Sequence, residues 1–260
     1  MFPERIRNST VFLHARLSLG RSMIKYSLLV QPLVYLLLVF AVLQMVGSPR
    51  TLSQAGLTAS LVAAWGTVVF TVIGEIGRER SMGTLGIISL TPQGIWGAFV
   101  RKAVGSVLLG GLPLLIWIGS VAAFQSLVLP DVGLAILALL CFMFAALALG
   151  LCFGALLVVF DKSRFLMNYL ELPIFLLSGF FVPISVFGPK LHFVASMLPT
   201  KWPVEALRNI VLNEQTSVAP QIAIAVGFAM SSALFGAARL ILRRAEYAAR
   251  KTGALEEQLG

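Results

Sequence analysis

Charged residues are scarce in this sequence. Of its 260 residues, only 12% are Asp, Glu, Lys or Arg, whereas 58% are hydrophobic. A soluble globular domain carries roughly 25% charged and about 45–50% apolar residues, and so little charge does not cover a water-soluble protein of this size. The composition therefore excludes a cytosolic enzyme, a disordered tail and a coiled coil. It predicts an all-α polytopic membrane protein.

Cysteine and histidine are also rare, with two residues of each. Two cysteines exclude a disulfide framework and a cysteine-rich metal site. The phosphate-binding loop G-x-x-x-x-G-K-[ST] is absent from the sequence, so we expect no ATP site of that type in this chain. Ser, His and Asp are too sparse for a buried triad. We therefore expect no intrinsic catalytic site, no bound cofactor and no metal.

Long hydrophobic runs dominate what is present. A membrane-spanning helix needs about 20 mostly apolar residues, and six stretches qualify: 27–46, 55–74, 103–124, 132–160, 165–186 and 220–241. The two long connectors, 75–102 and 187–219, leave no room for a folded extramembrane domain. We therefore predict a single transmembrane domain over residues 1–260, with six transmembrane helices.

The distribution of positive charge predicts the orientation. With six spans, only Arg50, Lys190, Lys201 and Arg208 fall on one side of the membrane, and the other 16 of the 20 Lys and Arg residues fall on the opposite side. The positive-inside rule assigns the richer side to the cytoplasm. We therefore expect a multi-pass cell-membrane protein with both termini cytoplasmic. The net charge of +9 then reflects topology and contact with anionic lipids, and we expect no nucleic-acid partner.

Two segments outside the spans have helical patterns. In residues 1–26, Ile6, Leu13, Leu17 and Ile24 share one helical face beside several arginines, which predicts a cytoplasmic amphipathic helix at the membrane surface. An ordinary basic flank is the alternative. The 75–102 connector combines closely spaced charges with a Pro stop at Pro92. It predicts a short amphipathic helix that is either an idle loop or a docking element.

The second connector, 187–219, is unusual for a loop. Together with the residues just before it, it is too apolar to be solvated, and it is too interrupted by Pro183, Pro189, Pro199 and Pro203 to span the membrane. Such a composition predicts short re-entrant or interfacial helices on the external side, before span six.

Two sequence blocks resemble hallmarks of the ABC-2-type transporter permeases. The first runs from Glu75 to Pro92 and matches E-x-x-R-E-x-x-x-G-T-L…T-P, which follows the second span in that family. The second runs from Leu177 to Pro183 and continues from Leu198 to Arg208, before the last span. Both blocks lie at the expected topological positions. One departure is Gly86, where many members carry an acidic residue.

The resemblance implies an exporter subunit that works with other chains. Two permease chains, identical or paralogous, pair as a dimer, and each engages a cytoplasmic ABC ATPase that binds ATP and Mg. In the family, the segment after span two is a coupling helix that enters a groove on the ATPase. This role is carried over to the matching positions, which are Glu75, Arg78, Glu79, Arg80, Gly83, Thr84 and Leu85. Leu85 and Ile88 are the expected apolar anchors of that contact, and Glu79, which is flanked by Arg78 and Arg80, is the charge whose reversal is expected to uncouple the two subunits.

Two helical stripes are candidates for a substrate pathway. One stripe lies on span two and the other on span five, where Glu171 is the single acidic residue. Helix packing is the alternative interpretation, because small residues let helices approach closely. The pathway candidates are Ser60, Thr67, Thr71, Asn168, Glu171, Phe175 and Ser178.

These features predict the permease subunit of an ATP-driven exporter, engaged in efflux of a lipophilic or amphipathic substrate such as a drug, a lipid, or a glycolipid or polysaccharide. Three alternatives stay open. An ion-coupled secondary carrier would depend on Glu171, a membrane-embedded lipid-modifying enzyme would need clustered carboxylates or histidines, and a membrane scaffold would tolerate bulky polar changes along the stripes.

Overall fold

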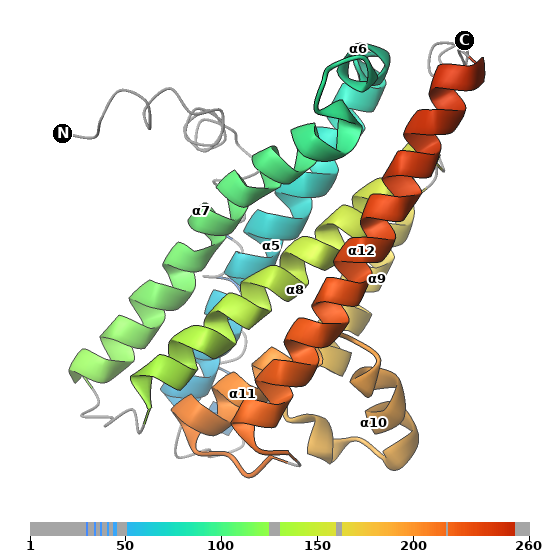
Figure 1. Cartoon of the computed structure of the whole chain (residues 1–260). Coiled ribbons are helices and arrows are strands. Elements are labelled where there is room, and N and C mark those ends of the chain that lie inside the picture. The colour runs from blue at the N-terminus through green and yellow to red at the C-terminus, as the bar shows by residue number, and fades with distance from the viewer. Residues whose placement is uncertain are drawn as a thin grey trace, which may run out of the picture.

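The protein is a bundle of long helices. The computed structural model describes residues 51–124, 131–159, 163–216 and 218–252, with isolated positions between 30 and 45. Every element in these ranges is helical: α5 (Thr51–Ser81), α6 (Leu85–Ser89), α7 (Gly94–Phe124), α8 (Val132–Val159), α9 (Ser163–Ser178), η2 (Ile184–Val186), α10 (Pro189–Ser196), α11 (Lys201–Leu212) and α12 (Pro220–Thr252). In Figure 1, α6 and the C-terminal end of α12 lie at one end of the bundle, and α10 and α11 lie at the other. We call these the α6 end and the α11 end.

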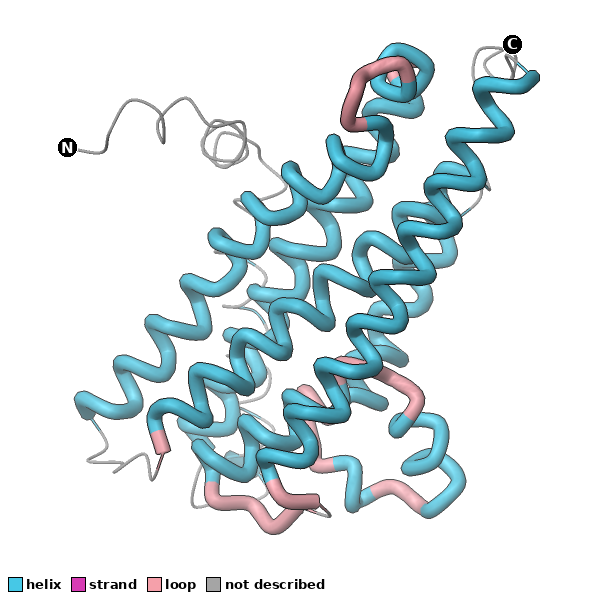
Figure 2. The backbone as a smooth tube through the Cα atoms, viewed as in Figure 1, coloured by secondary structure: helices cyan, strands magenta, loops and turns pink. Residues whose placement is uncertain are grey.

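Four of the six predicted spans are confirmed as helices long and apolar enough to cross a membrane. They are α5, α7, α8 and α12, which correspond to the predictions at 55–74, 103–124, 132–160 and 220–241. Three of these helices continue beyond their predicted ends, because charged residues at the ends of the apolar runs continue the helix instead of breaking it. As Figure 2 shows, the described loops gather at the two ends of the bundle.

The predicted end of the fifth span at residue 186 is wrong, because α9 ends at Ser178. Gly179 adopts a left-handed backbone conformation with φ +79°. The amide of Phe180 then donates to the carbonyl of Phe175, and that of Gly179 donates to Leu176. These two bonds form a Schellman motif, which terminates a helix, and the rings of Phe175 and Phe180 stack 4.8 Å apart across it. The apolar part of α9 is consequently shorter than the four spanning helices.

Two other predicted features have different outcomes. The helix predicted at 1–26 lies outside the described residues, as does nearly all of the span predicted at 27–46, so the count of six spans stays a prediction. The connector at 187–219 does contain two short helices before the last span, α10 and α11. Whether they re-enter the membrane likewise stays a prediction.

The core forms around α5, which is almost wholly buried, whereas only about a fifth of the apolar part of α12 is buried. Trp65 on α5 meets the rings of Phe175 and Phe180 edge to face. Small residues bring the helices close together: a Cβ on Gly110 of α7 would lie 2.8 Å from Val68 Cγ2, and one on Gly154 of α8 would lie 2.2 Å from Ile76 Cδ1. Such close approach is characteristic of helices packed in membranes.

Candidate functional site

The C-terminal end of α5 is shaped by Gly83. This glycine has φ +68°, and its amide donates to Arg80 while the amide of Thr84 donates to Glu79. The pair of bonds is again a Schellman stop. Because the chain turns there, α6 begins at Leu85, close to the last turns of α5. The glycine and threonine of the first sequence block therefore set the direction of the chain between α5 and α6.

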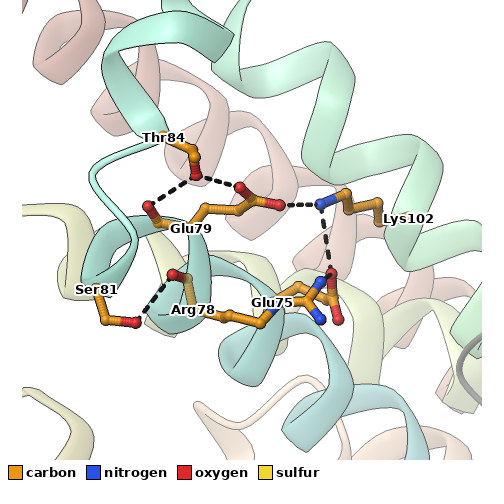
Figure 3. Close-up of polar contacts among 6 residues, drawn as sticks. All are labelled: Glu75, Arg78, Glu79, Ser81, Thr84 and Lys102. Carbon is orange, nitrogen blue, oxygen red and sulfur yellow. Dashed lines mark hydrogen bonds and ion pairs between the residues drawn. The ribbon is translucent and has the colours of Figure 1, made fainter.

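A network of four charged side chains lies directly beneath this turn (Figure 3). Lys102 of α7 forms an ion pair with Glu79 and lies 3.3 Å from Glu75 Oε2. Arg78 donates to the same Glu75 oxygen at 2.8 Å. The Glu75 side chain is 2% exposed, and a buried carboxylate is costly unless it is paired. Two cations and two carboxylates balance, so the network carries no net charge.

Thr84 extends the network to α6. Its hydroxyl donates to the Glu79 carboxylate and lies 3.0 Å from the Glu79 backbone carbonyl. Thr84 is also the residue that precedes the first turn of α6. Glu79 therefore joins three elements: its own helix α5, Lys102 on α7 and the start of α6.

The end of α5 also contacts α8, and the start of α7 also contacts α12. Arg80 donates to the carbonyl of Leu157 near the end of α8. Gly94, the first residue of α7, has φ +62°, and a Cβ there would lie 2.6 Å from Oε1 of Glu246 on α12. Trp96 packs edge to face on Phe235 of α12, with ring centroids 4.9 Å apart. Of these helices, α7 and α12 contact α6 directly, and α5 leads into it through the turn at Gly83.

Helix α6 and the turns on either side of it expose apolar side chains. Leu85 is buried and Ile88 packs against the core, whereas Met82, Ile87 and Leu90 are 65%, 69% and 80% exposed. We call these three residues the α6 surface. An exposed apolar surface on a rigid support is typical of a protein-binding site. The three-residue spacing of Ile87 and Leu90 is compatible with one helical face, but the sequence alone does not show that this face is the exposed one.

The structure changes the interpretation of the seven predicted coupling residues. Glu75, Arg78, Glu79 and Arg80 belong to the last two turns of α5, not to a separate coupling helix, because nothing breaks the helix before Gly83. The Glu79 side chain is 14% exposed and paired internally, and its role in coupling stays a prediction. The expected apolar anchors, Leu85 and Ile88, also face inward. Gly83 and Thr84 form the turn, and the residue that the sequence did not single out is Lys102.

The predicted pathway residues on α5 are buried. The hydroxyls of Ser60 and Thr67 donate to carbonyls four residues earlier in the helix. Thr71 is 6% exposed, and its hydroxyl has no hydrogen-bond partner in the described part of the chain. Hydroxyls that donate to a carbonyl in the preceding turn, as those of Ser60 and Thr67 do, allow polar residues to lie in an apolar helix. In this structure the α5 stripe is a packing face.

The predicted pathway residues on α9 have different environments. Phe175 is fully buried in the aromatic core, and the Ser178 hydroxyl lies 2.6 Å from that of Thr200. Glu171 is half-buried. Asn168 belongs to α9, but its side chain lies outside the described part of the structure. Helices α5 and α9 meet where Trp65 of α5 contacts Phe175, at a ring-centroid distance of 5.9 Å.

The α11 end contains a second polar cluster. The Arg208 guanidinium donates to both carboxylate oxygens of Glu214, at 2.8 and 2.9 Å, and to the carbonyl of Gly179. Gln54 of α5 donates to the same carboxylate. A small pocket lies beside this cluster and is also lined by His192. Within the described ranges, no group of three or more His, Cys, Asp or Glu residues is placed to hold a metal ion.

Comparison with known proteins identifies the family. A search of curated proteins found no match. The family model described as ABC-2 type transporter matches residues 14–212, which is most of the chain and includes both ends of the bundle from α5 to α11. The match agrees with the apolar spanning helices and with the two sequence blocks at Glu75–Pro92 and Leu177–Arg208. The chain therefore belongs to the ABC-2 type transporter family and is a membrane-domain component of a transporter.

Proposed function

We propose that this chain is the permease subunit of an ATP-driven exporter, and that a separate ABC ATPase docks on the α6 surface. The observation that carries the proposal is the exposure of Met82, Ile87 and Leu90 on and beside a short helix that contacts the spanning helices α7 and α12. Protein interfaces have an apolar centre and a polar rim. The chain lacks a phosphate-binding loop, so ATP and Mg would be bound by the partner ATPase.

We place the α6 end in the cytoplasm. Basic residues gather at this end on α5, α7 and α12, and basic residues are typical of cytoplasmic segments. Both termini would then be cytoplasmic, in the cell membrane. The basic residues in question are Arg78, Arg80, Arg101, Lys102, Arg239, Arg243 and Arg244.

A second permease chain, identical or paralogous, would complete the transporter. Apolar side chains face outward along the spanning helices, among them Leu108 and Leu112 of α7 and Ile136 and Leu140 of α8. In a membrane such surfaces contact lipid or another transmembrane subunit. The permease dimer would occupy part of this surface and membrane lipids the remainder.

The substrate pathway would run along α5 and α9. Ser60, Thr67, Thr71 and Phe175 are packed in this structure, so the pathway is closed in this conformation and would open when α5 and α9 separate. Weakly polar hydroxyls among apolar side chains suit a lipophilic or amphipathic cargo. Glu171 and Asn168 would add polar groups to the part of the pathway that belongs to α9.

Co-purification tests the proposed ATPase partner. The tagged chain is purified from membranes of its source cells, and its partners are identified by mass spectrometry. We expect a protein that carries G-x-x-x-x-G-K-[ST] and hydrolyses ATP. The double variant Ile87→Glu/Leu90→Glu should lose this partner, because it places two charges in the apolar centre of the contact.

The matched control is Val186→Glu, which puts a charge on an equally exposed apolar residue at the α11 end. It should retain the ATPase. Transport that continues without any ATPase and that is abolished by Glu171→Gln would contradict the proposal and indicate an ion-coupled carrier.

A further inference from the structure

Lys102 occupies a position that no sequence motif marks. It lies on α7, 23 residues after Glu79, yet its ammonium group contacts carboxylates on two successive turns of α5. Figure 3 shows it reaching across from α7 to both Glu75 and Glu79. In the part of the chain that the structure describes, Lys102 thus links α7 to the end of α5 through polar contacts.

The link continues into α6. Glu79 accepts hydrogen bonds from Lys102 and from the Thr84 hydroxyl at the same time, through its two carboxylate oxygens. The chain of contacts therefore runs from Lys102 through Glu79 to Thr84, the residue before α6. We call these three residues the brace. A charge-assisted contact of this kind has a defined geometry and is stronger than a hydrogen bond between neutral groups.

Neither the packing of α5 against α7 nor the stop at Gly83 depends on the brace. The two helices pack closely through Gly110, and the backbone bonds of Gly83 and Thr84 end α5 without any side chain. What the brace adds is a direct side-chain connection between the start of α6 and a second spanning helix. Such a connection matters most if a force is applied to α6.

We propose that Lys102 is a positioning residue that makes α6, the end of α5 and the start of α7 move as one unit when a partner pushes on the α6 surface. The inference rests on the proposed function, because the partner is the ABC ATPase. It goes beyond docking by separating two properties. The α6 surface decides whether the ATPase binds, and the brace decides whether the bound ATPase and the membrane helices influence each other.

The test uses the complex of the full chain with the ATPase that co-purifies with it. Two quantities are measured for each variant: the ratio of ATPase to permease, and the ATP hydrolysis of the complex relative to the isolated ATPase. Lys102→Gln removes the charge of the brace, and Lys102→Arg retains it. Arg101→Gln is the matched control, because it removes the neighbouring cation, which is not among the residues of the brace.

We expect Lys102→Gln to keep the ATPase ratio within about twofold of the unaltered chain and to lose at least fivefold in permease-dependent hydrolysis. Lys102→Arg and Arg101→Gln should both stay within about twofold on both measurements. A purely structural role for Lys102 would instead lower hydrolysis only in proportion to the ATPase lost.

A second pair of variants covers the case in which Lys102→Gln does not fold. Thr84→Val removes the hydroxyl of the brace with little change in shape, and Thr84→Ser retains it. We expect Thr84→Val to lower permease-dependent hydrolysis about threefold, with the ATPase ratio unchanged and Thr84→Ser active.

Three results would overturn the proposal. Normal hydrolysis in both Lys102→Gln and Thr84→Val would remove the brace from coupling while leaving ATPase docking intact. Equal losses in Lys102→Gln and Lys102→Arg would show that the charge is not what matters. If the unaltered chain binds no ATPase, the proposed function itself fails, and this inference fails with it.

Discussion

The two ends of the bundle use the same kinds of residues in opposite ways. At the α11 end, the charges of Lys201 and Arg208 are buried, with side chains 1% and 4% exposed. At the α6 end, the cations of the network stay partly in solvent, with Arg78 and Lys102 38% and 26% exposed. At each end, a helix terminates at a glycine with a left-handed backbone conformation, Gly83 at the α6 end and Gly179 at the α11 end.

The difference indicates what each end must do. The buried Arg208 ties α11, the Gly179 turn and the following loop into one unit. Breaking a buried ion pair by removing one partner is strongly destabilising. The α6 end instead pairs its charges behind a short helix and leaves apolar side chains outside. One end is thus fixed internally, whereas the other presents a surface.

Removing the buried cation at the α11 end should have the largest effect. Arg208→Met would leave the Glu214 carboxylate and the Gly179 carbonyl without their guanidinium partner. We expect a loss of about 3–5 kcal/mol in the free energy of unfolding, as is typical for one partner of a buried pair. Thermal unfolding of the purified protein in detergent measures it.

The double variant Arg208→Met/Glu214→Gln is the control for this prediction. It removes both charges, so it should lose less than the sum of the two single variants. A loss below about 1 kcal/mol in Arg208→Met would contradict the distinction between the two ends.

The next largest losses of stability should come from substituting Gly83 and Gly179, the two glycines that terminate helices. A side chain in the left-handed region costs about 1–2 kcal/mol, so both Gly83→Ala and Gly179→Ala should destabilise the protein by about this amount. The Gly179→Ala loss should be the larger, because its Cβ would also lie 3.3 Å from Ile184 Cγ1 in a buried turn. Paired melting curves compare the two variants, and a larger loss in Gly83→Ala would reverse the comparison.

The same chemical change at the α6 end should cost little. Arg78→Met removes a cation whose pair with Glu75 is partly exposed, and exposed pairs contribute up to about 1 kcal/mol. Lys102 remains beside Glu75 and continues to neutralise it. We expect a loss in unfolding free energy of at most about 1 kcal/mol in the same assay as Arg208→Met. Equal losses in the two variants would show that the ends do not differ.

The smallest effect should be a gain at Gly86. This glycine lies inside α6, and a Cβ there would meet no atom within 4 Å. Glycine in a helix is roughly 0.5–1 kcal/mol worse than alanine, so Gly86→Ala should stabilise the protein by about 0.5 kcal/mol. A measurable loss of stability would mean that α6 requires the conformational freedom of this glycine.

Hydropathy predicted the α5, α7, α8 and α12 spans because long apolar runs suffice for that purpose. It did not place the end of α9, because Phe180 and Val182 are as apolar as the span before them. The turn depends on the left-handed conformation of Gly179 and on the stacking of Phe175 with Phe180. Apolar composition does not distinguish a span that continues from an apolar turn that folds back on it.

The candidate site could be predicted in part. The block at Glu75–Pro92 indicated the right region, but it ends before the residue that pairs with Glu79. The actual partner, Lys102, lies on the next long helix and becomes visible only when α5 and α7 are placed together. The sequence also could not tell whether Leu85 or Ile87 faces outward, because α6 is a single short helix whose orientation is set by the turn at Gly83.

Site-specific photo-crosslinking tests the central claim most directly, namely that the ATPase docks at the α6 surface. A photoreactive residue is placed at Ile87, at Leu90 or at the equally exposed Val186 of the α11 end, and the purified complex is irradiated. We expect crosslinks to the ATPase from positions 87 and 90 and none from position 186. Crosslinks from position 186, or none from 87 and 90 in a complex that contains the ATPase, would contradict the claim.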